Sequence, residues 1–175
     1  HSCDLSACEM TSLPVLCSSV VDEENNRQIQ NQISNFFKGT VIWRYWKNAP
    51  LPKDFSSDYE SPGLGSDRLL AALAARRSWP EKKIMVLASF GTATTVDTIF
   101  QNQYCGGLIA PGMVLMAQSL ATHTANLAVQ QGERVAIPNN TADAIHTAII
   151  AAQLGCIEHA LRAAHQLNQN PSDAI

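Results

Sequence analysis

The sequence is poor in charged residues and has no long uninterrupted apolar segment, and each shortage argues against a class of protein. Only 15% of its 175 residues are charged, and the formal net charge is −3. The Lys and Arg residues are scattered, whereas nucleic acids and anionic membranes are bound by clustered cations. Apolar runs such as residues 84–88 are shorter than the roughly 20 residues that span a bilayer. We therefore expect neither nucleic acid nor a membrane as partner.

Cysteine and histidine pairs at metal-binding spacing are also missing. The five cysteines are an odd number and include no CxxC pair, so neither a disulfide framework nor a zinc site is indicated. His159 and His165 lack the i, i+4 spacing of zinc ligands on a helix, which argues against a metal-dependent hydrolase. This composition suits a reducing compartment, and we expect a cytoplasmic protein.

Apolar segments of strand length alternate with amphipathic segments of helix length. Strands are predicted at residues 13–21, 41–46, 84–88, 92–100, 106–110 and 135–138, and helices at residues 24–37, 67–77, 113–130 and 142–166. Only a short turn at Gly91-Thr92 separates two of these strands, so residues 84–100 should form a hairpin. The order of elements indicates an α/β protein with mixed sheets, and Trp79-Pro80 marks a boundary between residues 1–80 and 81–175.

Asp67 and Arg68 stand at the head of a predicted helix, directly after Gly65-Ser66. An aspartate at this position commonly caps free backbone amides. Alternatively, Asp67 is a general base and Arg68 binds a carboxylate or phosphate through two parallel hydrogen bonds. The residues by themselves leave both interpretations open.

Two glycine-containing turns could bring the backbone close to a ligand. Gly91 precedes three threonines in residues 92–95, whose amides and hydroxyls could hold phosphate oxygens. Residues 106–112 (GGLIAPG) place a glycine pair before a strand and a Pro-Gly turn before a helix. A threonine-rich hairpin and a plain tight turn explain the same residues without any ligand.

The three motifs together, in this order, resemble those of the bacterial type III pantothenate kinases. Further matching segments are residues 18–20 (SSV), 59–62 (YESP), 119–120 (SL), 124–127 (TANL) and 140–145 (NTADAI). The resemblance covers roughly residues 14–158. It implies a ribonuclease-H-like (actin-like) fold of duplicated mixed-sheet domains with flanking helices. Residues 1–80 would form a partial N-terminal lobe with the substrate loop, and residues 81–175 a lobe with the second phosphate loop and dimer helices.

The resemblance also implies an activity, the ATP-dependent phosphorylation of pantothenate to 4′-phosphopantothenate, the first step of coenzyme A biosynthesis. Asp67 would be the catalytic base, and Gly91 and Thr92 would contact the phosphates of ATP, which Mg²⁺ accompanies. The residues implied to bind pantothenate are Tyr59, Gly65, Ser66, Asp67, Arg68 and Thr141. Thr141 would reach pantothenate across the interface of a homodimer.

The chain departs from the family pattern at three places. Residues 1–21 contain no Asp-x-Gly-Asn-Thr segment, which forms the first phosphate loop of the family, and no Gly-Gly motif follows the last predicted helix. Ser89 stands where the family has the aspartate that binds a monovalent cation, K⁺ or NH₄⁺, and a hydroxyl does not supply that charge. We therefore expect a fold that is incomplete at both ends. Two interpretations remain: an active kinase, or a degenerate relative that acts as a pantothenate-binding or regulatory and structural dimer module.

Overall fold

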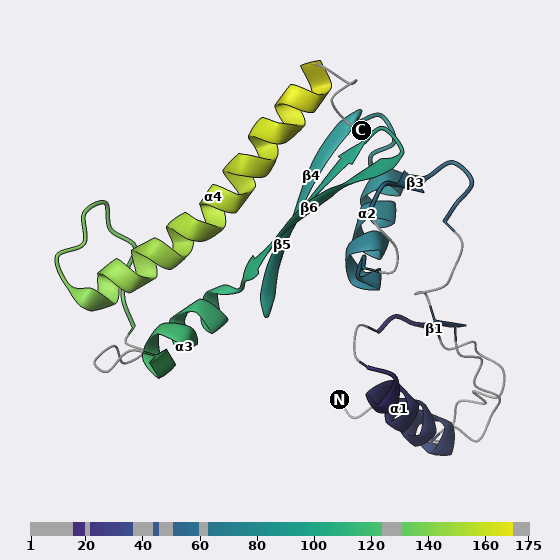
Figure 1. Ribbon diagram of the computed structural model, residues 1–175, viewed down its shortest axis with the longest axis horizontal. Helices are drawn as coiled ribbons and strands as arrows, with labels where there is room; N and C mark the ends of the chain where they lie inside the picture. Colours follow the sequence, from purple (N-terminus) through teal and green to yellow (C-terminus); the bar gives the residue numbers. More distant parts are fainter. Residues whose placement is uncertain are drawn as a thin grey trace, which may run out of the picture.

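The central element of the fold is a four-stranded sheet of strand order β3-β6-β5-β4, with α2 on one face and α4 on the other (Figure 1). The structure is a computed structural model that describes residues 16–19, 22–36, 44–45, 51–59, 63–123 and 131–169. The predicted mixed α/β class is confirmed.

Three antiparallel strands make up most of the sheet: β4 (Ile84–Phe90), β5 (Ala93–Phe100) and β6 (Gln103–Pro111). The predicted hairpin is confirmed, since β4 and β5 pair from Ile84 opposite Phe100 to Phe90 opposite Thr94. β6 begins before the predicted residue 106, because the chain reverses at Gln101, which has a φ of 52°. Its start pairs in parallel with β3 (Ser56–Ser57), a strand too short to be seen in the sequence pattern.

Helix α2 (Ser66–Ser78) packs on one face of this sheet. The buried cluster beneath it consists of Phe55, Ala72, Ala75, Ile99 and Tyr104. The small alanine side chains allow the helix to approach the strands closely. Asp67 in the first turn and two arginines in the last turn complement the helix dipole, as the sequence indicated. This core joins residues from both sides of the predicted boundary at residue 80.

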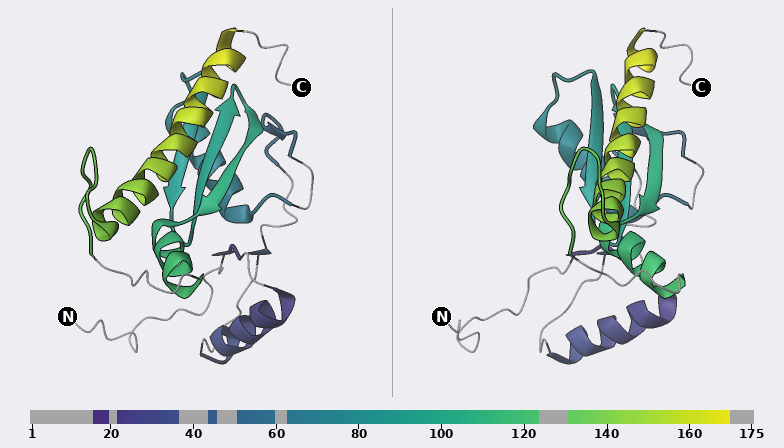
Figure 2. Two further views of the ribbon diagram at one scale, coloured as in Figure 1. Left: turned by 60° about the vertical axis from the view of Figure 1, so that its left-hand side comes forward. Right: turned by 90° about the vertical axis from the view of Figure 1, so that its left-hand side faces the viewer.

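Helix α4 (Thr141–Gln169) covers the opposite face and contacts all three long strands (Figure 2). Its buried residues, Ile149, Gln153, Ala160 and Ala164, follow helical spacing along one side. By length and composition α4 could also cross a membrane, although polar residues interrupt its apolar runs. Because the helix lies along the sheet, this is only a weak indication of a membrane span.

Residues 131–140, which lead into α4, contain no strand, so the strand predicted at 135–138 is wrong. Side chains of α4 bind this segment instead. The Thr147 hydroxyl accepts a hydrogen bond from the Val135 amide at 3.1 Å, and Asp143 Oδ1 accepts one from the Glu133 amide at 2.7 Å. The backbone amides that a strand would offer to a neighbouring strand are therefore used by the helix.

The N-terminal elements are a two-stranded parallel sheet and one helix. β1 (Leu16–Cys17) pairs with β2 (Arg44–Tyr45), and the rest of the two predicted strands lies outside the described residues. α1 (Glu23–Phe36) closely matches the predicted helix.

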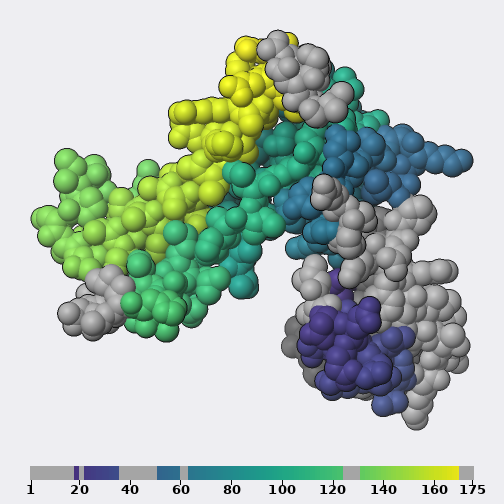
Figure 3. Space-filling view, viewed as in Figure 1, coloured from purple at the N-terminus to yellow at the C-terminus, as the bar shows by residue number. Residues whose placement is uncertain are grey.

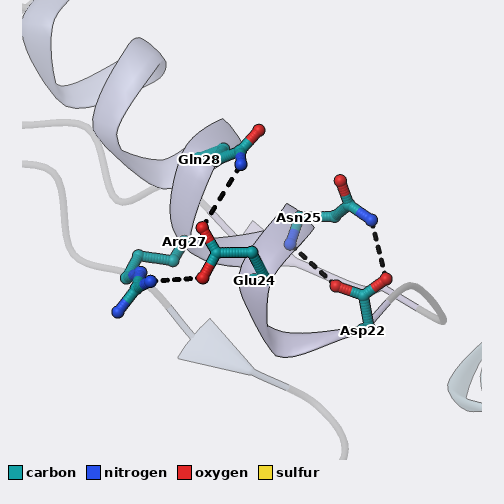
Figure 4. A network of polar contacts seen from close by, with 5 residues as sticks. All are labelled: Asp22, Glu24, Asn25, Arg27 and Gln28. Atoms are coloured by element: carbon teal, nitrogen blue, oxygen red, sulfur yellow. Dashed lines mark hydrogen bonds and ion pairs between the residues drawn. The ribbon is translucent and has the colours of Figure 1, made fainter.

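Asp22 caps the start of α1 (Figure 4). Its Oδ1 accepts a hydrogen bond from the Asn25 amide at 2.9 Å, and its Oδ2 accepts one from the Asn25 side chain at 2.7 Å. These two bonds lower the pKa of the Asp22 carboxyl, the backbone amide having the larger effect. In the first turn of the helix, Glu24 pairs with Arg27 and accepts a hydrogen bond from Gln28. The helix start is thus stabilised by its own side chains.

Candidate functional site

The three sequence motifs meet on the sheet face that carries α2. Directly opposed residues of antiparallel strands share a face. Two successive rows on this face are Leu87–Asp97–Gly107 and Ser89–Thr95–Ile109. The first row lies under the start of α2, whereas Ser89 and Ile109 in the second row are exposed. Because a strand rises roughly 3.3 Å per residue, the rows lie about 7 Å apart.

The Pro111-Gly112 turn packs against the tip of the β4–β5 hairpin. The Gly112 amide donates a hydrogen bond to the Thr92 carbonyl at 2.8 Å. A Cβ atom on Gly112 would lie only 2.0 Å from the Gly91 carbonyl oxygen, so this approach requires glycine. The two glycine motifs therefore form one surface, on which Gly91 and Thr92 are exposed.

Arg68 is buried, and its guanidinium is paired inside the protein. Its Nε and Nη2 donate hydrogen bonds to Asp97 Oδ1 at 3.0 and 2.5 Å, and the Tyr104 hydroxyl donates to the same oxygen at 2.6 Å. The side chains of Arg68 and Asp97 are each only 5% exposed. Arg68 Nε and Nη2, which we expected to donate to a ligand anion, thus donate to Asp97 instead. Whether Arg68 also contacts pantothenate stays a prediction.

The environment of this cluster fixes its protonation. Burial acts to lower the pKa of the Arg68 guanidinium, but the hydrogen bonds and charge of Asp97 outweigh burial, so the pKa is raised. Burial and the hydrogen bond to Asp97 both raise the pKa of the Tyr104 hydroxyl. Arg68 therefore stays cationic and Tyr104 stays neutral in the physiological range.

Tyr59, a predicted pantothenate ligand, lies against this ion pair. The Arg68 Cζ atom is 5.5 Å from the centre of the Tyr59 ring and 5.9 Å from that of Tyr104. The two rings meet edge to face, with centres 5.9 Å apart. Such contacts between a cation and aromatic faces favour the charged guanidinium in a buried place.

Gly107 leaves the space that the ion pair needs. It lies directly opposite Asp97 in the β5–β6 pairing. A Cβ atom at position 107 would be 2.3 Å from Asp97 Oδ1 and 2.9 Å from Arg68 Nη2. Gly107 therefore lies close to Arg68, just as Gly112 lies close to Gly91 and Thr92.

Asp67 is exposed, although both of its neighbours are buried. Ser66 is 6% exposed, and its hydroxyl lies 2.8 Å from Ser18 Oγ and 3.5 Å from the Ser19 carbonyl, at the end of β1. Arg68 is held by Asp97 on β5, as described above. Hydrogen bonds thus hold the first turn of α2 at two places, Ser66 at the end of β1 and Arg68 on β5, and Asp67 lies between these two residues.

Asp67 is not the N-cap of α2 but a residue of its first turn, the other of the two structural places that the sequence allowed. The N-cap residue is Gly65, which has extended dihedral angles and no capping side chain, and its carbonyl accepts a hydrogen bond from the Leu69 amide at 3.2 Å. Asp67 lies inside the first turn instead. Its carboxylate therefore projects from the helix start without serving as the cap.

Two predicted site residues lie away from this cluster or lack the expected chemistry. Thr141 is the exposed first residue of α4, and the start of α4 lies far from α2, on the opposite side of the sheet (Figure 1). Ser89 is exposed at the end of β4, opposite Thr95. Among the described residues, no group of three or more His, Cys, Asp or Glu side chains could hold a metal ion.

Asp97 and Tyr104 were given no role from the sequence, although they organise the buried half of the site. One feature of the sequence pointed to Asp97: it is a charged residue within the predicted strand 92–100, among residues suited to a buried strand. A buried charge needs a partner of opposite sign. The partner itself, Arg68, is not visible from that pattern.

The fold and the site together define an α/β protein with an exposed glycine-threonine turn at a hairpin tip and an exposed aspartate in the first turn of a helix, features suited to phosphoryl transfer. The family model described as type III pantothenate kinase matches residues 3–163. The chain belongs to the type III pantothenate kinase family, as the motifs indicated.

Individual relatives support this assignment. The chain is 34% identical over 154 residues to the type III pantothenate kinase of Herminiimonas arsenicoxydans, covering 85% of this chain and 59% of that protein. It is 48% identical over 102 residues to the type III pantothenate kinase of Bordetella petrii, covering 57% of this chain and 39% of that protein. The chain thus spans less than two thirds of the length of these relatives.

A solved structure has the same fold. A crystal structure from Campylobacter jejuni, described as a Baf family transcriptional activator, superposes with a TM-score of 0.60 over 87% of this chain and 66% of that chain. The sequence identity of 23% limits this comparison to the fold.

Proposed function

We propose that this chain carries out the ATP-dependent phosphorylation of pantothenate to 4′-phosphopantothenate, the first step of coenzyme A biosynthesis, in the cytoplasm. The observation that carries the proposal is the placement of Asp67. It is exposed at the start of α2, between two anchored neighbours, and the Gly91-Thr92 tip is exposed at the end of the β4–β5 hairpin. Two lobes of ribonuclease-H-like (actin-like) type are part of the same proposal.

In the proposed reaction, Asp67 accepts the proton of the pantothenate hydroxyl. The hydroxyl oxygen forms a bond to the γ-phosphorus of ATP while the bond between that phosphorus and the β–γ bridging oxygen breaks, and ADP leaves. Gly65, Ser66 and Arg68 flank Asp67 in the chain, Tyr59 lies against Arg68, and these four residues would contribute to the pantothenate site. Phosphoryl transfer requires mainly such orientation together with charge neutralisation.

The ATP phosphates would lie between the start of α2 and the Gly91-Thr92 tip. α2 begins beside Asp97 and continues past Ile99, so its N-terminus points along β5 toward the tip. A helix N-terminus favours negative charge, and a glycine turn lets backbone amides approach phosphate oxygens. Mg²⁺ would arrive bound to ATP and neutralise part of the phosphate charge.

The residues around Ser89 do not fit the monovalent cation that the family binds at this position. Ser89 and its cross-strand partner Thr95 offer hydroxyl groups. The described residues supply no cluster of acidic side chains there. We therefore assign no step of the reaction to K⁺ or NH₄⁺.

The direct test is steady-state turnover of pantothenate and ATP by the chain, measured as ADP release. Asp67→Asn should lower kcat by about 10²- to 10⁴-fold, the usual contribution of a general base. Asp54→Asn, the same change at an exposed residue, serves as the control and should leave kcat unchanged. Full turnover by Asp67→Asn would contradict the role of Asp67. Absence of turnover by the wild-type chain at high enzyme concentration would contradict the kinase proposal itself.

We also propose a homodimer formed through α3 (Met113–His123) and α4. α3 is apolar but has no buried residue, and Val114 is 70% exposed. The two helices lie side by side at the surface (Figure 3). They border a groove of about 890 Å³ whose walls include Leu115, Ile145 and Ile149. A second copy of the chain would cover this apolar surface and bring its Thr141 toward the pantothenate of the partner.

Sedimentation measures this dimer directly. Leu115→Glu should convert the dimer to a monomer, because it buries a charge in the proposed interface. Ala71→Glu, on the exposed side of α2, is the matched control and should leave the dimer intact. A wild-type chain that sediments as a monomer at tens of micromolar would contradict the interface.

A further inference from the structure

We infer that Asp97, to which no motif gives a role, is a positioning residue: through Arg68 it fixes the first turn of α2 and thereby the direction of the Asp67 carboxylate. The inference rests on the proposed function of Asp67, but the anchoring itself can be measured without ligand or turnover.

The bonds to Asp97 converge on one atom. A single oxygen, Oδ1, accepts hydrogen bonds from Arg68 Nε, Arg68 Nη2 and the Tyr104 hydroxyl. Two donors on one rigid, planar guanidinium determine the direction of the Arg68 side chain as well as its distance. Tyr104 in turn holds the carboxylate from the neighbouring strand β6. Asp97 therefore joins α2, β5 and β6 at one atom.

Asp67 lies between two residues whose side chains are both held. Successive residues of a helix point about 100° apart, so Ser66, Asp67 and Arg68 face three different directions. Ser66 is bound at the end of β1, and Arg68 is bound on β5. With both flanking side chains held, the first turn cannot rotate about its axis. The direction of Asp67, toward solvent, follows from the two attachments.

The absence of a side chain at Gly107 leaves space for this ion pair. Any side chain there would collide with Asp97 Oδ1, the Val96 carbonyl oxygen and Arg68 Nη2. Buried ion pairs often add little net stability compared with apolar residues of similar volume. The arrangement is therefore better suited to fixing a geometry than to stabilising the fold. A general base needs such accuracy, because it must lie within hydrogen-bond reach of the hydroxyl, and a 1 Å error can cost about 10²-fold in rate.

The test is amide hydrogen exchange in the ligand-free chain, read segment by segment. Asp97→Asn keeps the shape of the side chain but removes its charge. We expect exchange in residues 66–70 to become about tenfold to a hundredfold faster, the effect of weakening hydrogen bonds to a charged group. Exchange in α4 and in β4 should change far less. Asp54→Asn should change neither region.

A purely structural role predicts a different pattern. If Asp97→Asn accelerates exchange equally in α2, β4 and α4, the pair merely stabilises the fold and the inference is overturned. Unchanged exchange in residues 66–70 would overturn it as well. Both outcomes are read without substrate, so they are independent of whether the wild-type chain phosphorylates pantothenate.

A second variant keeps the inference testable if Asp97→Asn fails to fold. Tyr104→Phe removes one of the three donors and leaves the ion pair in place. Exchange in residues 66–70 should then rise by roughly fivefold, as expected for one hydrogen bond. In turnover assays, the same variant should lower kcat while the KM for ATP stays constant, because only the Asp67 side of the site is disturbed. An unchanged kcat together with unchanged exchange would contradict the inference.

Discussion

The two faces of the central sheet are held in different ways. On the α2 face, the buried polar groups of Arg68, Asp97 and Tyr104 are bonded to one another. On the α4 face, contacts are mainly apolar, and two buried polar atoms, Thr94 Oγ1 and Gln153 Oε1, have no hydrogen-bond partner among the described residues. Hydrogen bonds between charged groups thus hold α2 to its face, whereas α4 packs mainly through apolar side chains and one hydrogen bond, from Gln153 Nε2 to the Pro111 carbonyl at 3.1 Å. The candidate site lies on the face where directions are fixed.

Breaking the ion pair between Arg68 and Asp97 should cause the largest loss of stability. Arg68→Met keeps much of the side-chain volume but leaves Asp97 buried without a partner, which should lower the free energy of unfolding by about 3–5 kcal/mol. Arg77→Met, at an exposed position of the same helix, should change it by less than about 0.5 kcal/mol. Denaturant unfolding compares the two. Equal stabilities would show that the pair does not hold α2.

Two glycine substitutions test the difference between the two faces by adding a methyl group instead of removing a charge. Gly107→Ala places a methyl group against Asp97 and Arg68 on the α2 face and should destabilise the fold by about 1–3 kcal/mol. Gly155→Ala, on α4, meets no atom within 4 Å and should stabilise the helix by about 0.5–1 kcal/mol. The two variants should therefore change the free energy of unfolding in opposite directions. An unchanged free energy of unfolding in Gly107→Ala would contradict the close packing at the ion pair.

On the α4 face, removing an unpartnered polar atom should increase the stability of the fold. Thr94→Val replaces the unpartnered hydroxyl with a methyl group of similar size, and we expect a gain in stability of about 1 kcal/mol. Thr98→Val, on the same face of β5 but less buried, should be close to neutral. A loss of stability in Thr94→Val would show that its hydroxyl has a partner.

The smallest effect concerns pH. Burial and the Asp97 hydrogen bond raise the pKa of Tyr104 above its ordinary value of 10.0. Above that pH the unfolded chain loses the tyrosine proton while the folded chain keeps it, so the contribution of Tyr104 to stability is present below about pH 10 and falls as the pH rises further. The difference in unfolding free energy between wild type and Tyr104→Phe should therefore shrink above pH 10. A constant difference would contradict the burial of the hydroxyl.

Local sequence features predicted most of the elements but not their long-range pairings. The β4–β5 hairpin follows from two strand-forming runs around Gly91-Thr92, and α2 from strong helix formers with charges at both ends. β3 was missed because its two residues pair with Gln103–Tyr104, far along the chain. The strand expected at 135–138 was wrong because Thr147, on α4, takes the amide of Val135.

The candidate site shows the same limit. Asp67 and Arg68 were found because motifs preserve residue order, and order is visible in a sequence. The partner of Arg68 was not found, since Asp97 lies 29 positions away and only folding brings the two together. Consequently Arg68 was expected to face a ligand, whereas its guanidinium is paired inside the protein.

The most direct test of the account is a crystal structure of the chain with pantothenate bound. The account predicts that the hydroxyl to be phosphorylated lies within about 2.6–3.2 Å of the Asp67 carboxylate, with Arg68 still paired to Asp97. Pantothenate bound elsewhere, or an Arg68 that leaves Asp97 to bind the ligand carboxylate, would contradict the claim that the ion pair positions the base.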